Sequence, residues 1–229
     1  MGKNLIKIFL ISLAILFSSC EESTSPNGSK NDSLLPLQIG NYWTYYQFTL
    51  TPPTSVDSFK LIIENLFTNN AQNDFSNAYI MSIYDLRFGN KLDYRWLYKN
   101  EPDGLYLLGG ISASDTLLRK IKLLKYPVDS NEVWLVPNIT YQIDEGVFKI
   151  KDTTLYKCVS TKGRFTLNGQ EYFCYVYHHR TRQGDDILAY WEIFDFYVPN
   201  TGKIGSIIMV DTVVTHRIEL RDFKLLFPY

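Results

Sequence analysis

The sequence is poor in the residues that usually build reactive sites. Its 229 residues include only three cysteines and three histidines. It contains no C-x-x-C pair, no H-E-x-x-H, no G-x-S-x-G elbow, no P-loop and no dinucleotide fingerprint, so the common local signatures of catalysis are missing. The formal net charge of -1 excludes a strongly basic nucleic-acid binder. We therefore expect no catalytic residue, no metal and no cofactor.

Aromatic residues, in contrast, are abundant. They make up 15% of the chain, with 17 Tyr and 14 Phe, while hydrophobic residues as a whole reach 45%. That composition excludes a disordered chain, and the aromatic load favours half-buried pleated surfaces. We expect an all-β protein.

The first residues have the pattern of an export signal. Lys3 and Lys7 precede an apolar run over residues 8–17, which is too short to cross a bilayer as a helix. The sequence Leu16-Phe17-Ser18-Ser19-Cys20 resembles the lipobox of bacterial lipoproteins, although Phe17 departs from the usual Leu. The resemblance implies cleavage after residue 19 and lipidation (diacylglyceryl and palmitate-like acyl groups) of Cys20. The alternative is an ordinary secretory signal with a chance cysteine.

The residues after Cys20 predict where the protein is anchored. Glu21 and Glu22 lack the Asp that marks inner-membrane retention, and an acidic pair is similar to a surface-export signal of some Bacteroidetes lipoproteins. We expect an outer-membrane location with the leaflet left open. Residues 20–34 are polar and predict a lipidated Cys with a flexible linker of roughly 20 Å. Residues 35–229 then form a single domain.

Alternating apolar and polar residues predict an antiparallel sheet over this domain. Turn signals recur every ten to fourteen residues, which suits strands joined by hairpins. Residues 134–137, 140–150 and 153–161 are expected to form three separate strands. Residues 115–125 carry both helix and strand signals, and we favour a strand because the neighbours are strands.

Two short segments echo each other. Residues 36–43 and 127–134 both read Pro, an aliphatic residue, a turn and then Trp, at a spacing of 91 residues. The echo predicts two related half-sheets, with coincidence as the alternative.

The opening of the domain also resembles exported lipoproteins of Bacteroidetes-like bacteria that begin PL-x-x-GN-x-W-x-Y. The residues concerned are Pro36 to Tyr45, with later landmarks at Gly163-x-Phe165 and at residues 197–205. This resemblance implies a strongly curved antiparallel sheet, such as a half-barrel, and brings no activity with it. A β-sandwich is the alternative architecture.

Two cysteines follow the anchor position. Cys158 and Cys174 lie on consecutive predicted strands, and oxidising conditions outside the inner membrane allow a disulfide between them. If Asn168-Gly169 forms a tight turn, however, Cys174 faces Gly163 and the bridge is disfavoured. Two buried thiols are the alternative.

The polar candidates for a site are weak. His178 and His179 are adjacent on a strand, so their side chains point to opposite faces and cannot readily share a metal. His216 is the third histidine. Glu192 and Asp195 are treated as ordinary surface residues.

The aromatic residues are the last candidates. They either fill a core, line a concave apolar cradle or stack on sugars. The possible ligand-lining residues are Trp43, Tyr45, Phe173, Tyr175, Tyr177 and Trp191. The sequence as a whole favours a non-enzymatic interaction or scaffold role in the cell envelope, with an envelope protein as partner and the membrane bound through Cys20. The first alternative is a carrier or sensor of an apolar ligand, and the second is a hydrolase on a β scaffold.

Overall fold

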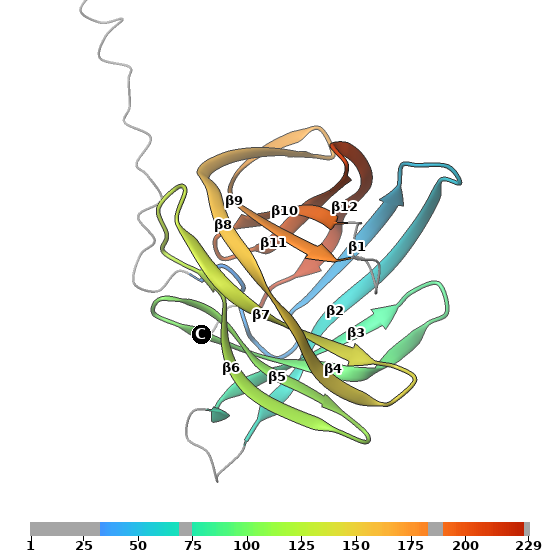
Figure 1. Cartoon of the computed structure of the whole chain (residues 1–229), viewed down its shortest axis with the longest axis vertical. Helices are drawn as coiled ribbons and strands as arrows, with labels where there is room; N and C mark the ends of the chain where they lie inside the picture. Colours follow the sequence, from blue (N-terminus) through green and yellow to red (C-terminus); the bar gives the residue numbers. More distant parts are fainter. Residues whose placement is uncertain (1–32, 69–74, 183–189, 227–229) are drawn as a thin grey trace, which may run out of the picture.

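The domain is one antiparallel sheet that curves until its ends almost meet (Figure 1). The computed structural model describes residues 33–68, 75–182 and 190–226, so Cys20, the signal segment and most of the linker lie outside the described residues. The strands are β1 (Tyr42–Thr49), β2 (Ser55–Phe67), β3 (Ala78–Asp85), β4 (Asn90–Glu101), β5 (Gly104–Ser112), β6 (Thr116–Lys125), β7 (Val133–Gln142), β8 (Val147–Leu167), β9 (Gln170–Arg182), β10 (Tyr190–Val198), β11 (Gly202–Val210) and β12 (Val213–Lys224). The predicted all-β, strongly curved architecture is confirmed.

Within the described ranges, every strand of the sheet pairs with its neighbours in the chain, except at β6 and β7, which do not pair, and at β1 and β12, which do. The sheet runs β6-β5-β4-β3-β2-β1-β12-β11-β10-β9-β8-β7, so the first strand pairs with the last. The two edge strands are therefore β6 and β7, which follow one another in the chain without pairing in the sheet. No helix among the described residues has the length and apolar character needed to span a bilayer.

The repeat seen in the sequence corresponds to repeated backbone geometry. The backbone N–H of Asn41 donates to Gln38 O at 3.0 Å, and the backbone N–H of Glu132 donates to Asp129 O at 3.2 Å. The residue before each has a positive φ, 91° at Gly40 and 70° at Asn131. The turns match because each reverses the chain into a strand that opens one half of the sheet.

The same turns attach to the neighbouring strand in the same way. Gly40 N donates to Ile63 O at 2.8 Å, and Ile63 N donates back to Asn41 O at 2.9 Å. In the second half, Cys158 takes the place of Ile63: Asn131 N donates to Cys158 O, and Cys158 N donates to Glu132 O. The half-sheets β1–β6 and β7–β12 thus open with the same turn, attached to the neighbouring strand in the same way, which favours the repeat over coincidence.

The core lies inside the curve of the sheet. Trp43 and Tyr45 point inward and are almost fully buried, and the segment before β1 closes the core with Leu34, Leu35 and Leu37. Leu34 belongs to the predicted linker by its position in the sequence, yet only 1% of it is exposed. Packing against the sheet therefore starts before residue 35.

Two strand boundaries differ from the sequence prediction. The chain turns at Asp144 to Gly146, where the amides of Glu145 and Gly146 donate to Gln142 O, and β8 then continues past residue 151 without a break. The expected break between residues 137 and 140 is also absent, and the side-chain amide of Asn138 donates to Asp152 and Thr154 across the strand pair. Residues 116–125 form a strand, as favoured.

Candidate functional site

Four of the six predicted ligand-lining aromatics are core residues. Trp43, Tyr45, Tyr175 and Tyr177 are each 3% exposed or less. Three of their polar atoms bond to backbone carbonyls: Trp43 Nε1 to Thr201 O at 2.7 Å, Tyr45 Oη to Lys203 O at 2.8 Å, and Tyr177 Oη to Lys125 O at 2.8 Å. Satisfied polar atoms and close ring packing make these side chains parts of the folded core.

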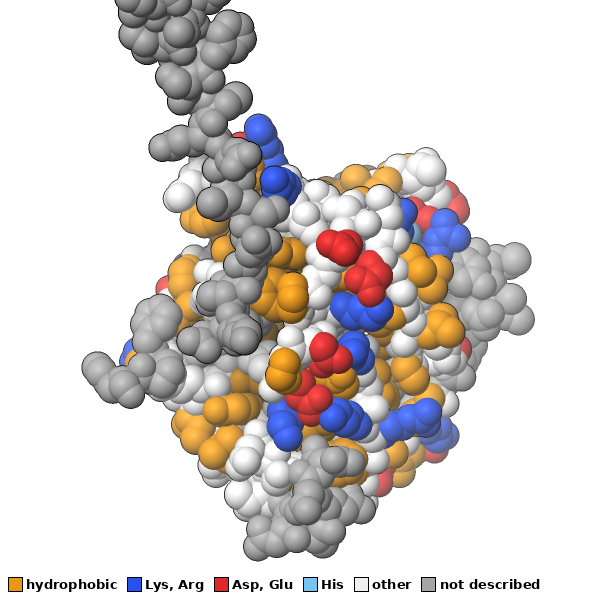
Figure 2. Space-filling view, turned by 90° about the vertical axis from the view of Figure 1, so that its left-hand side faces the viewer, with side chains coloured by type: hydrophobic (Ala, Val, Ile, Leu, Met, Phe, Trp, Pro, Cys, Tyr) orange, Lys and Arg blue, Asp and Glu red, His pale blue; other side chains and the backbone are white. Residues whose placement is uncertain are grey.

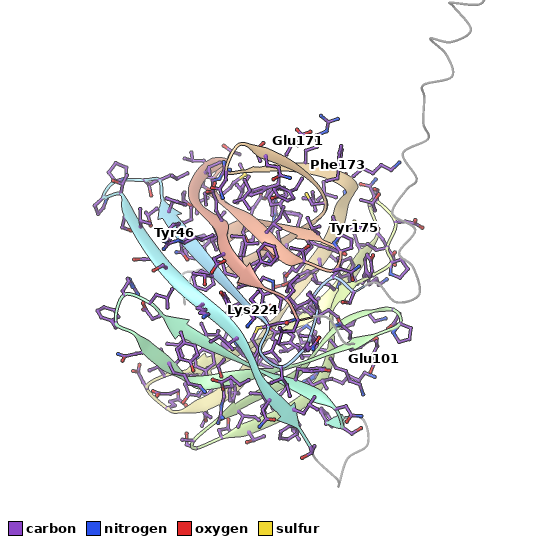
Figure 3. The ribbon with its side chains drawn as sticks, turned by 180° about the vertical axis from the view of Figure 1, so that it is seen from behind. Tyr46, Glu101, Glu171, Phe173, Tyr175 and Lys224 are labelled. Atoms are coloured by element: carbon purple, nitrogen blue, oxygen red, sulfur yellow. The ribbon has the colours of Figure 1, made fainter. Side chains whose placement is uncertain are left out.

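The remaining two aromatics lie elsewhere. Phe173 is 64% exposed, although it shares a face of β9 with Tyr175 and Tyr177. Figure 3 shows Phe173 with Glu171 toward the outer part of the hairpin and Tyr175 further in. Phe173 is therefore not part of the core, unlike the two tyrosines on the same face. Trp191 is half-buried, with its ring centroid 5.7 Å from that of His216.

Of the two alternatives for the cysteine pair, a disulfide or two buried thiols, the structure shows the thiols. Cys158 and Cys174 are both buried free thiols. The tight Asn168-Gly169 turn sets the register, so that Cys174 faces Gly163 while Cys158 faces Tyr177. Burial raises the pKa of the Cys158 thiol to about 11 and that of Cys174 to about 12. Because the thiolate is the reactive form, both thiols are held in an unreactive state.

One buried polar cluster escaped the sequence analysis. Asp195, on β10, accepts a hydrogen bond from Ser206 Oγ at 2.5 Å and lies 3.4 Å from Lys203 Nζ. His179 Nε2 is 3.3 Å from the other carboxylate oxygen, and the imidazole stacks on Tyr156 at 4.3 Å. Asp195 was expected at the surface, but its side chain is only 12% exposed. The sequence carried no signal for this position, because alternation with Phe194 and Phe196 favours an outward Asp195.

The electrostatics of this cluster keep Asp195 charged. Burial alone would raise the pKa of Asp195, but the charge of Lys203 and the contacts with His179 and Ser206 outweigh it and lower the pKa below its ordinary value. A serine-protease-like triad needs the histidine between the serine and the carboxylate. Here Ser206 donates to the carboxylate itself, so Asp195 lies between the other two groups. That order suits a structural ion cluster.

The other histidines also lie apart from one another. His178 is on the opposite face of β9 from His179 and stacks on Phe194 with centroids 4.6 Å apart. Its Nε2 is buried without a hydrogen-bond partner, and desolvation lowers its pKa. His216 Nδ1 is 3.1 Å from Thr215 Oγ1. Among the described residues, no group of three His, Cys, Asp or Glu side chains is placed to hold a metal ion.

The outer surface of β7 and β8 carries an apolar patch. Leu135 lies directly opposite Leu155 in the strand register, and Val133 is two residues before Leu135 on the same face. Their exposed fractions are 68%, 54% and 49% for Leu135, Leu155 and Val133. The alternate residues Trp134 and Val136 point inward and are buried. We call Val133, Leu135 and Leu155 the β7–β8 patch.

This patch adjoins a free sheet edge. Because β7 ends the sheet, its outer backbone groups have no neighbouring strand among the described residues. Free edges and contiguous apolar surface are the two features by which sheets recruit other chains. Figure 2 shows the left-hand side of the molecule in Figure 1, where apolar side chains lie beside acidic and basic ones.

These features define a curved all-β protein whose candidate site is a surface for contact. No protein-family model matches the chain, and no curated protein matches it. Among solved structures, it is similar to a candidate exported protein with a YmcC-like fold from Bacteroides fragilis NCTC 9343. That likeness has a TM-score of 0.53 at 9% identity and covers 85% of this chain and 100% of that one.

A second solved structure is similar over a comparable length. It is a candidate lipoprotein from Parabacteroides distasonis ATCC 8503, with a TM-score of 0.42, 11% identity, and coverage of 84% of this chain and 99% of that one. At this level of identity, the first likeness supports the fold alone.

Proposed function

We propose that the protein is a lipid-anchored lipoprotein of the outer membrane with a non-catalytic interaction role. The observation that carries the proposal is the coincidence of the β7–β8 patch with the free edge of β7. An envelope protein is the partner that this surface suits, since apolar side chains of a partner can cover the exposed apolar residues beside the edge. The lipobox at Cys20 and the exported description of the Bacteroides neighbour support the location.

The anchor is tested by changing its attachment residue. We expect Cys20→Ser to release the protein from the membrane fraction, because two or three acyl chains on this residue supply the stable attachment. Fractionation of cells that express either form measures the effect. Membrane association of Cys20→Ser at the level of the unchanged protein would contradict lipid anchoring.

The interaction surface is tested by photo-crosslinking in cells. A photoreactive phenylalanine at position 135 should give discrete protein adducts, which a further Leu155→Glu substitution should abolish. The matched control places the same residue at position 88, because Phe88 is 70% exposed on another hairpin. Equal adducts at positions 88 and 135, or adducts that survive Leu155→Glu, would refute this use of the patch.

A further inference from the structure

The two half-sheets face each other at two places, where β1 meets β12 and where β7 meets β6. We call each place a seam, and in the described part of the chain only the first is closed by backbone pairing. β1 pairs with β12 over its whole length, from Tyr42 opposite Lys224 to Thr49 opposite His216. This closed seam joins the start of the first half to the end of the second. The repeat relates it to the contact between β7 and β6, which are not paired among the described residues. We call this second contact the open seam.

A proline explains why the open seam does not pair. Pro137 lies in the middle of β7, 91 positions after Tyr46, whose backbone pairs with Glu219 in the closed seam. Proline has no N–H to donate, and it is tolerated in sheets at edge positions. The register of β7 also shifts between Pro137 and Ile139. The strand that would complete the sheet therefore lacks both a donor and a regular register.

The open seam is nevertheless held at its two ends. At one end the chain itself connects β6 to β7, and Trp134 Nε1 donates to Leu123 O at 3.2 Å. At the other end the β5–β6 and β7–β8 hairpin tips meet, at the lower right of Figure 1. There Ser114 Oγ donates to Gly146 O at 2.7 Å, and Phe148 N donates to Asp115 Oδ2 at 2.7 Å. We call these two bonds the latch.

An aromatic cluster lies beside the latch and crosses between the half-sheets. Tyr94 and Trp96 come from β4, whereas Tyr141 and Phe148 come from β7 and β8. The centroid distance is 4.8 Å from Tyr94 to Tyr141 and 5.4 Å from Trp96 to Phe148. The Phe148 ring packs so closely on Gly110 that a Cβ there would overlap it. Separation of the hairpin tips would therefore pull these pairs of aromatic rings away from each other.

We propose that the open seam is a gate and that the separated aromatic cluster is a binding site for an apolar ligand. When the latch releases, Tyr141 and Phe148 move away from Tyr94 and Trp96, and an apolar ring or chain takes the place between them. Tyr94, Trp96 and Tyr141 are already half-buried, so the cluster is reachable from solvent on one side. The proposal goes beyond the interaction role and needs neither the lipid anchor nor the β7–β8 patch.

The structure offers a way to lock the latch. A Cβ built on Gly146 lies 3.7 Å from the Cβ of Ser114, within the usual range for a disulfide. The double variant Ser114→Cys/Gly146→Cys, made in the full chain with Cys20→Ser, can be studied oxidised and reduced. Gly146 has a φ of 68°, so the new side chain is strained, but the strain is present in both forms. The reduced form is therefore the matched control for the oxidised one.

Hydrogen exchange measures whether the seam opens. Oxidation should slow exchange in β6 and β7 by tenfold or more and leave β1 and β12 unchanged, because the closed seam does not depend on the latch. Equal exchange of β6 and β7 in the two forms would overturn the gate. A slowing of the same size in β1 and β12 would also overturn it, since it would indicate general stabilisation.

Binding of an uncharged fluorescent probe, N-phenylnaphthylamine, tests the ligand site. The reduced form should bind the probe and the oxidised form should bind at least tenfold more weakly. In the reduced form, Trp96→Leu should weaken binding, whereas Trp191→Leu in the other half should not. Equal binding by the oxidised and reduced forms, or no binding by the reduced form, would overturn the proposal.

Discussion

Removal of the Asp195 charge should cost the domain much of its stability. The carboxylate accepts from Ser206 at 2.5 Å and neighbours two basic groups, His179 at 3.3 Å and Lys203 at 3.4 Å. Asp195→Asn leaves those basic groups facing a neutral amide in a site that is 12% exposed. Loss of one partner from a buried pair costs about 3–5 kcal/mol. Because the side chain of Lys203 is 24% exposed, it can turn toward water when its partner is lost. We therefore expect a loss of stability at the lower end of this range, about 3 kcal/mol.

The size of the domain converts this free energy into a melting temperature. In a domain of this length each kcal/mol lowers Tm by about 2–4 °C, so Asp195→Asn should lower it by about 6–12 °C. Urea denaturation followed by tryptophan fluorescence gives the free energy of unfolding directly. Ser206→Ala removes one hydrogen bond and should cost about 1 kcal/mol more than a neutral surface change. Asp222→Asn is the exposed control, with an expected change below about 0.5 kcal/mol.

The pH dependence of the same variant supplies a second check. The pKa of Asp195 is lower in the folded protein than in the unfolded chain, so its stabilisation is present at neutral pH. It is lost only as the pH falls below the unfolded value of about 3.9 toward the folded one. The difference between wild type and Asp195→Asn should therefore be present at pH 7 and should shrink below about pH 4. An Asp195→Asn protein as stable as wild type at pH 7 would refute the reasoning.

Three further changes test other regions of the structure. Desolvation lowers the pKa of His178 in the folded protein, so the folded state loses stability as the pH falls below about 6.5 and the unfolded chain takes up the proton. His178→Phe should therefore reduce the pH dependence of the free energy of unfolding between about pH 5 and 7. Gly205→Ala places a Cβ 2.7 Å from Phe165 Cε1 and 2.8 Å from Ile218 O, and should cost about 1–3 kcal/mol in urea denaturation. Cys158 and Cys174 should resist a thiol reagent at pH 8 in the folded protein and both react in urea; an intact mass about 2 Da below the reduced value would instead show a disulfide.

Local sequence patterns predicted the elements of this fold well. Alternation and turn residues identified the sheet, and the Pro-to-Trp echo identified its two halves because each copy encodes the same turn. The same patterns failed at Asn138, where a polar side chain inside a strand finds partners on the neighbouring strand. A single sequence shows that such a residue is polar but does not show what lies opposite.

The candidate sites depended on information that is not local. Asp195 meets His179 and Ser206 only because three strands align in one register, and the spacing of these residues along the chain gives no sign of it. Likewise, Leu135 and Leu155 have the appearance of ordinary buried strand residues until the structure shows that they lie on the outer face of the curved sheet. Sheet order and curvature decided which apolar residues became core and which became surface.

The pairing of β1 with β12 also bears on how the chain folds during synthesis and during the export proposed above. β1 lies in the middle of the sheet, yet one of its two neighbours is the last strand of the chain. Contacts between segments so distant in sequence form slowly, because the intervening chain must be ordered first. A polypeptide that emerges with its N-terminus first must therefore keep one side of β1 unpaired until β12 arrives. The protein should thus depend on protection from aggregation until its last strand is available.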